Sequence, residues 1–185
     1  EGVIMIYIVM LLVIVLVWMV YTYNKLIRQR NMVNNQNSQI DIQLKRRFDL
    51  IPNLVEIVKG YAKHEKTTLE GVVHARNTFL NTDDTEKKLQ ADRQLNSALT
   101  RLFAVAEAYP DLLANQNFMN LQKELSETEN KIAFSRQFYN DSVFKLNNMI
   151  EMFPSFIVAK LFGFEGRKYF EIIESEKDNI SLDID

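Results

Sequence analysis

The chain has 185 residues and a formal net charge of −2 at pH 7, and this near-neutral balance gives no electrostatic basis for binding nucleic acid. It contains no cysteine, which excludes disulfides, cysteine-ligated metals and a thiol nucleophile. With 5 glycines and 3 prolines it has too few turn residues for a sheet of many strands, so we expect an all-α fold.

An unbroken apolar run extends from Val3 to Tyr21 without a charge, a proline or a glycine. As a helix it is about 28 Å long, which is close to the thickness of the hydrocarbon core of a bilayer. A cleavable signal peptide begins with Lys or Arg and ends in small residues, whereas this run follows Glu1 and ends in bulky side chains. We therefore expect residues 1–24 to be a retained transmembrane anchor in contact with the lipid bilayer.

The charges that flank the run predict its orientation. Lys25, Arg28 and Arg30 follow it, and no Lys or Arg precedes it. By the positive-inside rule the short N-terminus lies outside and the C-terminal part of the chain lies in the cytoplasm.

The apolar helix continues without a breaker into the segment that follows. Apolar residues at helical spacing predict a single helix of nearly fifty residues that ends near 49–52. Pro52 suits the first turn of a second helix, which we expect to run to about Leu80. At Pro52 we expect the chain to reverse in a hairpin rather than to continue through a kink.

Two further long helices are predicted downstream. Asp84 or Thr85 can cap a third helix that ends near Tyr109 and Pro110. The fourth helix has the clearest periodicity in the chain, an apolar or aromatic residue at every seventh position: Phe118, Leu125, Ile132, Tyr139, Leu146 and Phe153. About four long helices joined by short turns predict an elongated antiparallel bundle over residues 25–170.

The pattern changes after Pro154. A short apolar helix is expected from Ser155, which can cap it, to about Gly163. This stretch either folds back against the end of the bundle or presents an exposed apolar patch to a partner or to the membrane surface. Residues 171–185 form an acidic tail.

Five segments of the chain form a distinctive set: Lys45 to Glu56, Val58 to Ala62 followed by His64 and Glu65, Glu107 to Leu112, Phe138 to Ser142, and Phe153-Pro154 followed by Ala159 to Phe164. In this order they resemble the LemA family. This resemblance implies a bacterial inner-membrane protein with an N-terminal transmembrane helix and a cytoplasmic helical bundle. It implies a fold and no established reaction.

No catalytic or metal-binding constellation is evident. His64 and Glu65 begin like a zinc-protease motif, but Thr68 stands where the second histidine is needed. The Glu-x-x-His pairs that a di-metal bundle requires do not occur either. We therefore expect a non-enzymatic protein without a cofactor or a metal.

Three surfaces are candidates for interactions with other molecules. The first is an amide-rich face suited to self-association into a homo-oligomer, made of Asn31, Asn34, Asn35, Asn37 and Gln39. The other two are candidate surfaces for a cytoplasmic protein partner: a polar tip around Pro52 (Arg46, Arg47, Asp49, Asn53 and Glu56) and a C-terminal apolar segment (Phe156, Phe162 and Phe164). The sequence thus favours a self-associating scaffold, with an adaptor in envelope-stress or signalling pathways as the alternative.

Overall fold

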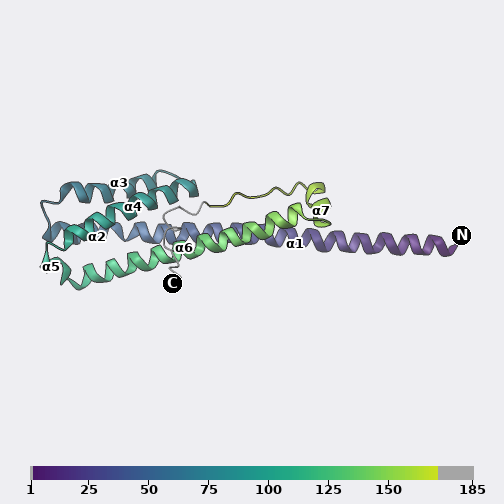
Figure 1. Ribbon diagram of the computed structural model, residues 1–185, viewed down its shortest axis with the longest axis horizontal. Coiled ribbons are helices and arrows are strands. Elements are labelled where there is room, and N and C mark those ends of the chain that lie inside the picture. The colour runs from purple at the N-terminus through teal and green to yellow at the C-terminus, as the bar shows by residue number, and fades with distance from the viewer. Residues whose placement is uncertain (1, 171–185) are drawn as a thin grey trace, which may run out of the picture. The chain divides into compact units, whose positions relative to one another are not determined.

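The structure is a computed structural model that describes residues 2–170, and it is all-helical there, with no strand (Figure 1). The chain divides into two compact units. The terminal unit combines residues 1–34 with 138–185, and the central unit comprises residues 35–137. Helices α1 (Gly2–Asp49) and α6 (Gln116–Glu151) each contribute to both units. The predicted acidic tail, residues 171–185, lies outside the described residues.

Helix α1 confirms the prediction of one helix of nearly fifty residues. Its side chains from Val3 to Val17 are 44–66% exposed, so no other part of the described chain covers this portion of the apolar run. By length and composition this helix is long and apolar enough to cross a membrane. Further along, Leu26 and Val33 are buried in the terminal unit. The helix thus changes from apolar on all sides to apolar along one stripe.

The predicted hairpin at Pro52 is wrong, because the chain continues through a local irregularity into α2 (Ile51–Tyr61). Leu50, between the two helices, has right-handed helical angles of φ −76° and ψ −22°. Its carbonyl accepts a hydrogen bond from the Leu54 N–H at 3.2 Å. The missing N–H of Pro52 therefore removes one hydrogen bond without reversing the chain. Ile51 is fully buried, and this packing outweighs the bias of a residue before proline against helix.

The single helix expected from Pro52 to about Leu80 is also wrong, because the structure divides it into α2 and α3 (Lys66–Leu80). Ala62 leaves the helical region, with φ −119° and ψ 62°, while its side chain remains fully buried. The break follows one residue after α2 ends and lies close to Gly60, which is a poor helix former. The turn that was expected at Pro52 therefore occurs between Tyr61 and Lys66.

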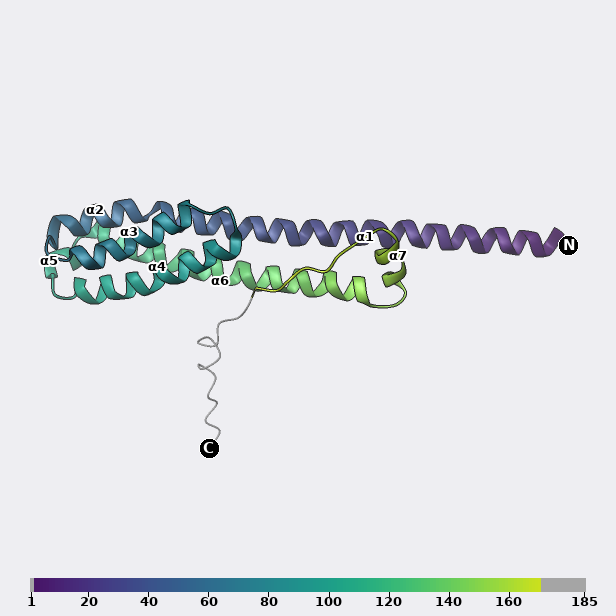
Figure 2. The ribbon, with the colours of Figure 1, turned by 90° about the horizontal axis from the view of Figure 1, so that it is seen from above.

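Helix α4 (Thr85–Ala106) confirms the predicted cap, because the Asp84 carboxylate accepts a hydrogen bond from the Lys87 N–H at 3.0 Å. Helices α3 and α4 lie side by side in the central unit (Figure 2). The stacked rings of Phe48 and Phe79, with centroids 4.2 Å apart, join α3 to α1. A short helix that the sequence did not predict, α5 (Pro110–Leu113), follows α4 and buries Leu112.

Helix α6 confirms the seven-residue repeat through Leu146, and its repeat positions Phe118 to Leu146 are all buried. Phe153 does not continue the repeat, because α6 ends at Glu151 and this side chain is 77% exposed. Helix α7 (Ser155–Leu161) is present as expected. The predicted Ser155 cap is wrong, because its hydroxyl donates to the Met152 carbonyl at 3.0 Å instead.

Candidate functional site

The most buried charged group in the described chain is Arg47 of the central unit, which is 1% exposed. Its guanidinium donates from Nη1 to Asp92 Oδ1 at 2.8 Å, and from Nη2 to Asn96 and to Glu129 Oε2, the latter at 3.3 Å. These partners lie on α4 and α6, so one side chain of α1 joins three helices. A buried charge needs such partners, because desolvation without them costs several kcal/mol. Arg47 is therefore an internal ion-pair residue, and its assignment to an exposed partner surface is wrong.

The same burial changes the ionisation of Asp92. Loss of solvent raises the pKa of its carboxyl above the ordinary value, and the adjacent Arg47 guanidinium offsets only part of that rise. Glu129 adds a smaller effect in the same direction as burial, because it is a second negative charge nearby. Compared with water, the surrounding protein thus disfavours the charged form of the Asp92 carboxyl.

Four of the five residues of the predicted amide-rich face are exposed. Asn31, Asn34, Asn35 and Gln39 are exposed on α1. At helical spacing they lie away from the buried stripe that contains Val33. Asn37 does not belong to this face, because it is half-buried and its Nδ2 donates to Thr85 Oγ1 at 3.4 Å.

The remaining members of the polar tip are exposed: Arg46 and Asp49 on α1, and Asn53 and Glu56 on α2. Asn53 and Glu56 line an open groove of about 370 Å³ between α2 and α6. The other residues that line this groove are Ile57, Asn117, Asn120, Leu121 and Glu124. Two carboxylates and three amides in one groove suit a polar or cationic chain segment more than an apolar ligand.

The C-terminal apolar segment combines the two interpretations left open by the sequence. Phe156 and Phe162 are exposed, whereas Val158 and Ala159 are fully buried in the terminal unit. Phe164 is half-buried between Tyr23 and Arg30 of α1 and is therefore not part of an exposed patch. The segment folds back against α1 and still presents apolar side chains to its surroundings.

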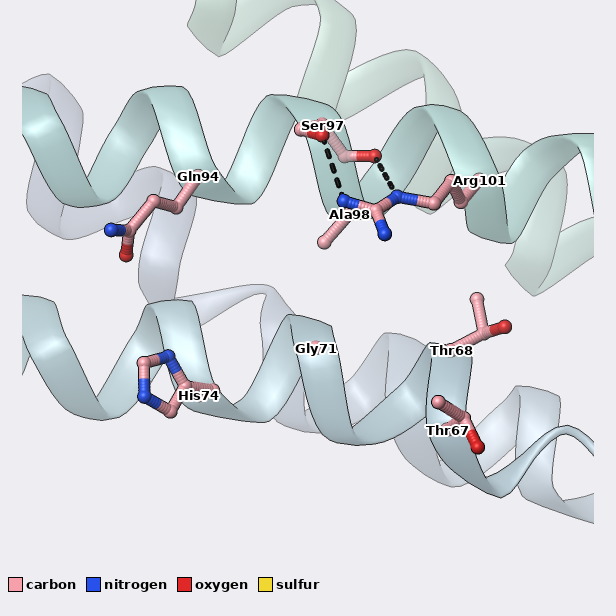
Figure 3. A pocket seen from close by; sticks show the side chains of 8 residues that line it. All are labelled: Thr67, Thr68, Gly71, His74, Gln94, Ser97, Ala98 and Arg101. Carbon is pink, nitrogen blue, oxygen red and sulfur yellow. Dashed lines mark hydrogen bonds between the residues drawn. The ribbon is translucent and has the colours of Figure 1, made fainter.

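A second cavity of about 320 Å³ lies between α3 and α4, which run antiparallel there (Figure 3). A Cβ added at Gly71 would lie 3.8 Å from the Cβ of Ala98, which is an ordinary van der Waals distance. The Arg101 guanidinium, which lines the cavity, donates to Ser97 of its own helix, to the backbone carbonyl at 3.3 Å and to Oγ at 3.0 Å. His74 also lines this exposed cavity. Within residues 2–170 no group of three or more His, Asp or Glu side chains is arranged to hold a metal ion.

Three residues of the Arg47 network were missed by sequence reasoning: Asp92, Asn96 and Glu129. A signal was present in the helical spacing. Arg47 is seven residues after Ile40, and Asp92 is three residues from both Leu89 and Leu95, so both occupy the apolar stripes of their helices. A charged residue at a stripe position indicates a buried partner on a neighbouring helix.

The family model described as LemA family matches residues 36–183, which is most of the chain. This chain belongs to the LemA family. The match begins within α1, 15 residues after the apolar run ends at Tyr21, and it includes the Arg47 network and the segment around α7.

Curated relatives extend the likeness. Over 158 residues the chain is 27% identical to Protein LemA of Metamycoplasma hominis, covering 85% of this chain and 72% of that protein. It is 25% identical to Magnetosome protein MamQ 2 of Paramagnetospirillum magneticum over 80% of this chain and 64% of that protein. This LemA-family chain thus spans somewhat less than two thirds of the magnetosome protein. Neither of these names denotes a catalytic activity.

Arg47→Met should destabilise the central unit strongly, because it leaves Asp92 buried without its cation. We expect a loss of about 3–5 kcal/mol in the free energy of unfolding, measured by urea titration of the full chain in mild detergent with helical circular dichroism. Arg46→Met is the matched control, since Arg46 is exposed and its loss should change stability by no more than about 0.5 kcal/mol. Equal effects of the two substitutions would contradict a buried ion pair.

The raised pKa of Asp92 predicts a pH dependence of stability. The folded state holds the Asp92 proton more tightly than the unfolded state does, so this stabilising contribution is complete below the unfolded pKa. It is lost as pH rises through the folded pKa. The free energy of unfolding of the native chain, measured relative to that of the Asp92→Asn variant, should therefore fall as the pH rises from the unfolded pKa to the folded pKa of Asp92. A difference that rises with pH would show instead that Arg47 holds the pKa below its ordinary value.

Proposed function

We propose that this LemA-family protein is a non-enzymatic scaffold of the bacterial inner membrane that self-associates through its membrane-proximal helix. In this proposal the start of α1 spans the bilayer, the N-terminus lies outside, and residues 25–170 lie in the cytoplasm. The uncovered apolar run from Val3 to Val17 supports the anchor. The exposed bases Lys25, Arg28 and Arg30 support the orientation.

The exposed amide-rich face is the observation that carries self-association. Asn31, Asn34, Asn35 and Gln39 follow the anchor by about two to four turns of the same helix. A primary amide is both a donor and an acceptor, so identical faces on two copies are complementary without any other partner. Anchoring also confines the copies to a plane and one orientation, which raises their effective concentration.

The particle mass of the native chain in mild detergent, measured by mass photometry, should therefore exceed the single-chain mass of 21.7 kDa. Asn35→Lys with Gln39→Lys places like charges on the facing surfaces of neighbouring copies, so we expect it to lower the assembled mass. The matched control, Asn77→Lys with Gln90→Lys, adds the same charge to exposed amides of α3 and α4 and should leave the mass unchanged. A monomer at every concentration would refute the scaffold.

The groove between α2 and α6 favours a second candidate function, an adaptor that binds a cytoplasmic protein in a signalling or envelope-stress pathway. Glu56 and Glu124 line the groove with amides from both helices. Carboxylates suit the Lys or Arg side chains of a partner segment, and the amides suit its backbone. The exposed Arg46 and Asp49 extend this polar surface along α1.

For the adaptor, proximity labelling in the native host should yield a different protein as the main labelled species. Glu56→Lys with Glu124→Lys reverses the charge of the groove, so we expect that labelling to fall markedly. Glu86→Lys with Glu107→Lys makes the same charge change on exposed residues outside the groove and serves as the control. If the chain mainly labels itself and neither pair has an effect, the adaptor function is wrong.

A further inference from the structure

The terminal unit presents large apolar side chains around α7, which we call the α7 surface. Its members are 40–77% exposed: Met152, Phe153, Phe156, Ile157, Leu161 and Phe162. The opposite side of α7 carries Val158 and Ala159, which are fully buried. The helix thus has its small side chains packed inward and its large ones directed outward. In a water-soluble helix the large apolar side chains are expected to face the core instead.

The α7 surface lies beside the end of the apolar run of α1. The Phe162 ring is 4.8 Å from the Tyr23 ring, centroid to centroid, and the Phe164 ring is 5.8 Å from it. Tyr23 is two residues beyond Tyr21, the last residue of the uncharged run. Both views of the ribbon place α7 against this part of α1 (Figures 1 and 2). The exposed apolar surface of the run and that of α7 therefore belong to one region of the terminal unit.

The chain on the C-terminal side of α7 is held firmly in place. Gly163, at φ +65°, ends the helix in a left-handed residue, and the Phe164 N–H donates to the Ala159 carbonyl at 2.9 Å. Beyond it, two asparagines of α6 each exchange a pair of 2.9 Å hydrogen bonds with the extended backbone. Asn147 pairs in this way with Arg167, and Asn140 with Phe170. The α7 surface is thus preorganised rather than part of a loose end.

Basic side chains accompany this apolar surface. Lys160 on α7 and Arg167 and Lys168 beyond it are exposed, as are the bases that follow the run on α1. Lys and Arg next to apolar side chains suit the boundary between anionic lipid headgroups and acyl chains, where their long stems reach toward the headgroups.

We propose that the α7 surface is a lipid-docking surface that lies in the headgroup region of the leaflet from which α1 emerges. Its apolar side chains enter the upper acyl layer, and the nearby bases contact anionic headgroups. The protein then has two membrane contacts, one across the bilayer and one along its surface. This inference rests on the proposed membrane anchor.

The test uses tryptophan fluorescence of the full chain, reconstituted in vesicles of phosphatidylethanolamine and phosphatidylglycerol with brominated acyl chains. Trp18 is the only tryptophan and reports the anchor itself. Phe156→Trp and Phe153→Trp, each combined with Trp18→Phe, report the α7 surface at two exposed positions. The matched control is Phe138→Trp in the same background, since Phe138 is exposed on α6 about 20 Å along the helix from its end.

We expect the brominated lipid to lower the fluorescence of both α7 reporters at least about twofold, because the apolar face of an interfacial helix reaches the acyl chains, and to leave the Phe138 position unchanged. Quenching of Trp18 without quenching of either α7 reporter would overturn the inference and leave the anchor intact. Reporters shielded from both brominated lipid and aqueous iodide would show that protein covers the surface, which also overturns it. If Trp18 itself is not quenched, the proposed anchor fails, and the docking inference fails with it.

Discussion

The continuity of one helix is the constraint on which the rest of the structure depends. In a lipid environment each backbone N–H and C=O must be satisfied within the segment, which requires a helix over the apolar run. No proline or glycine interrupts α1 before Asp49, so the same helix continues into the central unit. Its apolar side chains change from exposure on all sides to a single buried stripe, and in the central unit Phe48 and Arg47 of α1 contact α3, α4 and α6.

Arg47 lies on this stripe and gives the central unit its polar centre. Apolar packing is tolerant of small shifts, whereas the guanidinium must meet Asp92, Asn96 and Glu129 with suitable geometry. We interpret the network as a device that specifies the register of α1 against α4 and α6, because an ion pair of this kind adds less stability than it adds specificity. Such a role suits a protein whose proposed function is structural, since assembly depends on a defined surface.

In the terminal unit, side-chain amides hold an extended segment of the chain in place. The segment after α7 is extended and has no neighbouring strand among the described residues. Asn140 and Asn147 lie two turns apart on α6. Their side-chain amides pair with backbone N–H and C=O groups of this extended segment, as a neighbouring strand would. Tyr139 adds a ring contact to Phe170 at 4.4 Å. Side chains of α6 therefore hold the extended chain that follows α7.

By itself the sequence determined the all-helical class, the length of α1, a cap at Asp84 or Thr85 and the buried repeat of α6 through Leu146, because each depends on local spacing or on one side chain near its own backbone. The amide-rich face on α1 stays a prediction of self-association, although four of its five residues are exposed. Only the tertiary structure decided that the chain continues through Pro52 and turns near Ala62, because the burial of Ile51 outweighs a local bias. It likewise decided that Arg47 meets Asp92, Asn96 and Glu129, and that two asparagines hold the chain beyond α7. These outcomes depend on partners from distant helices, and periodicity along one helix carries no information about which distant residue will meet it.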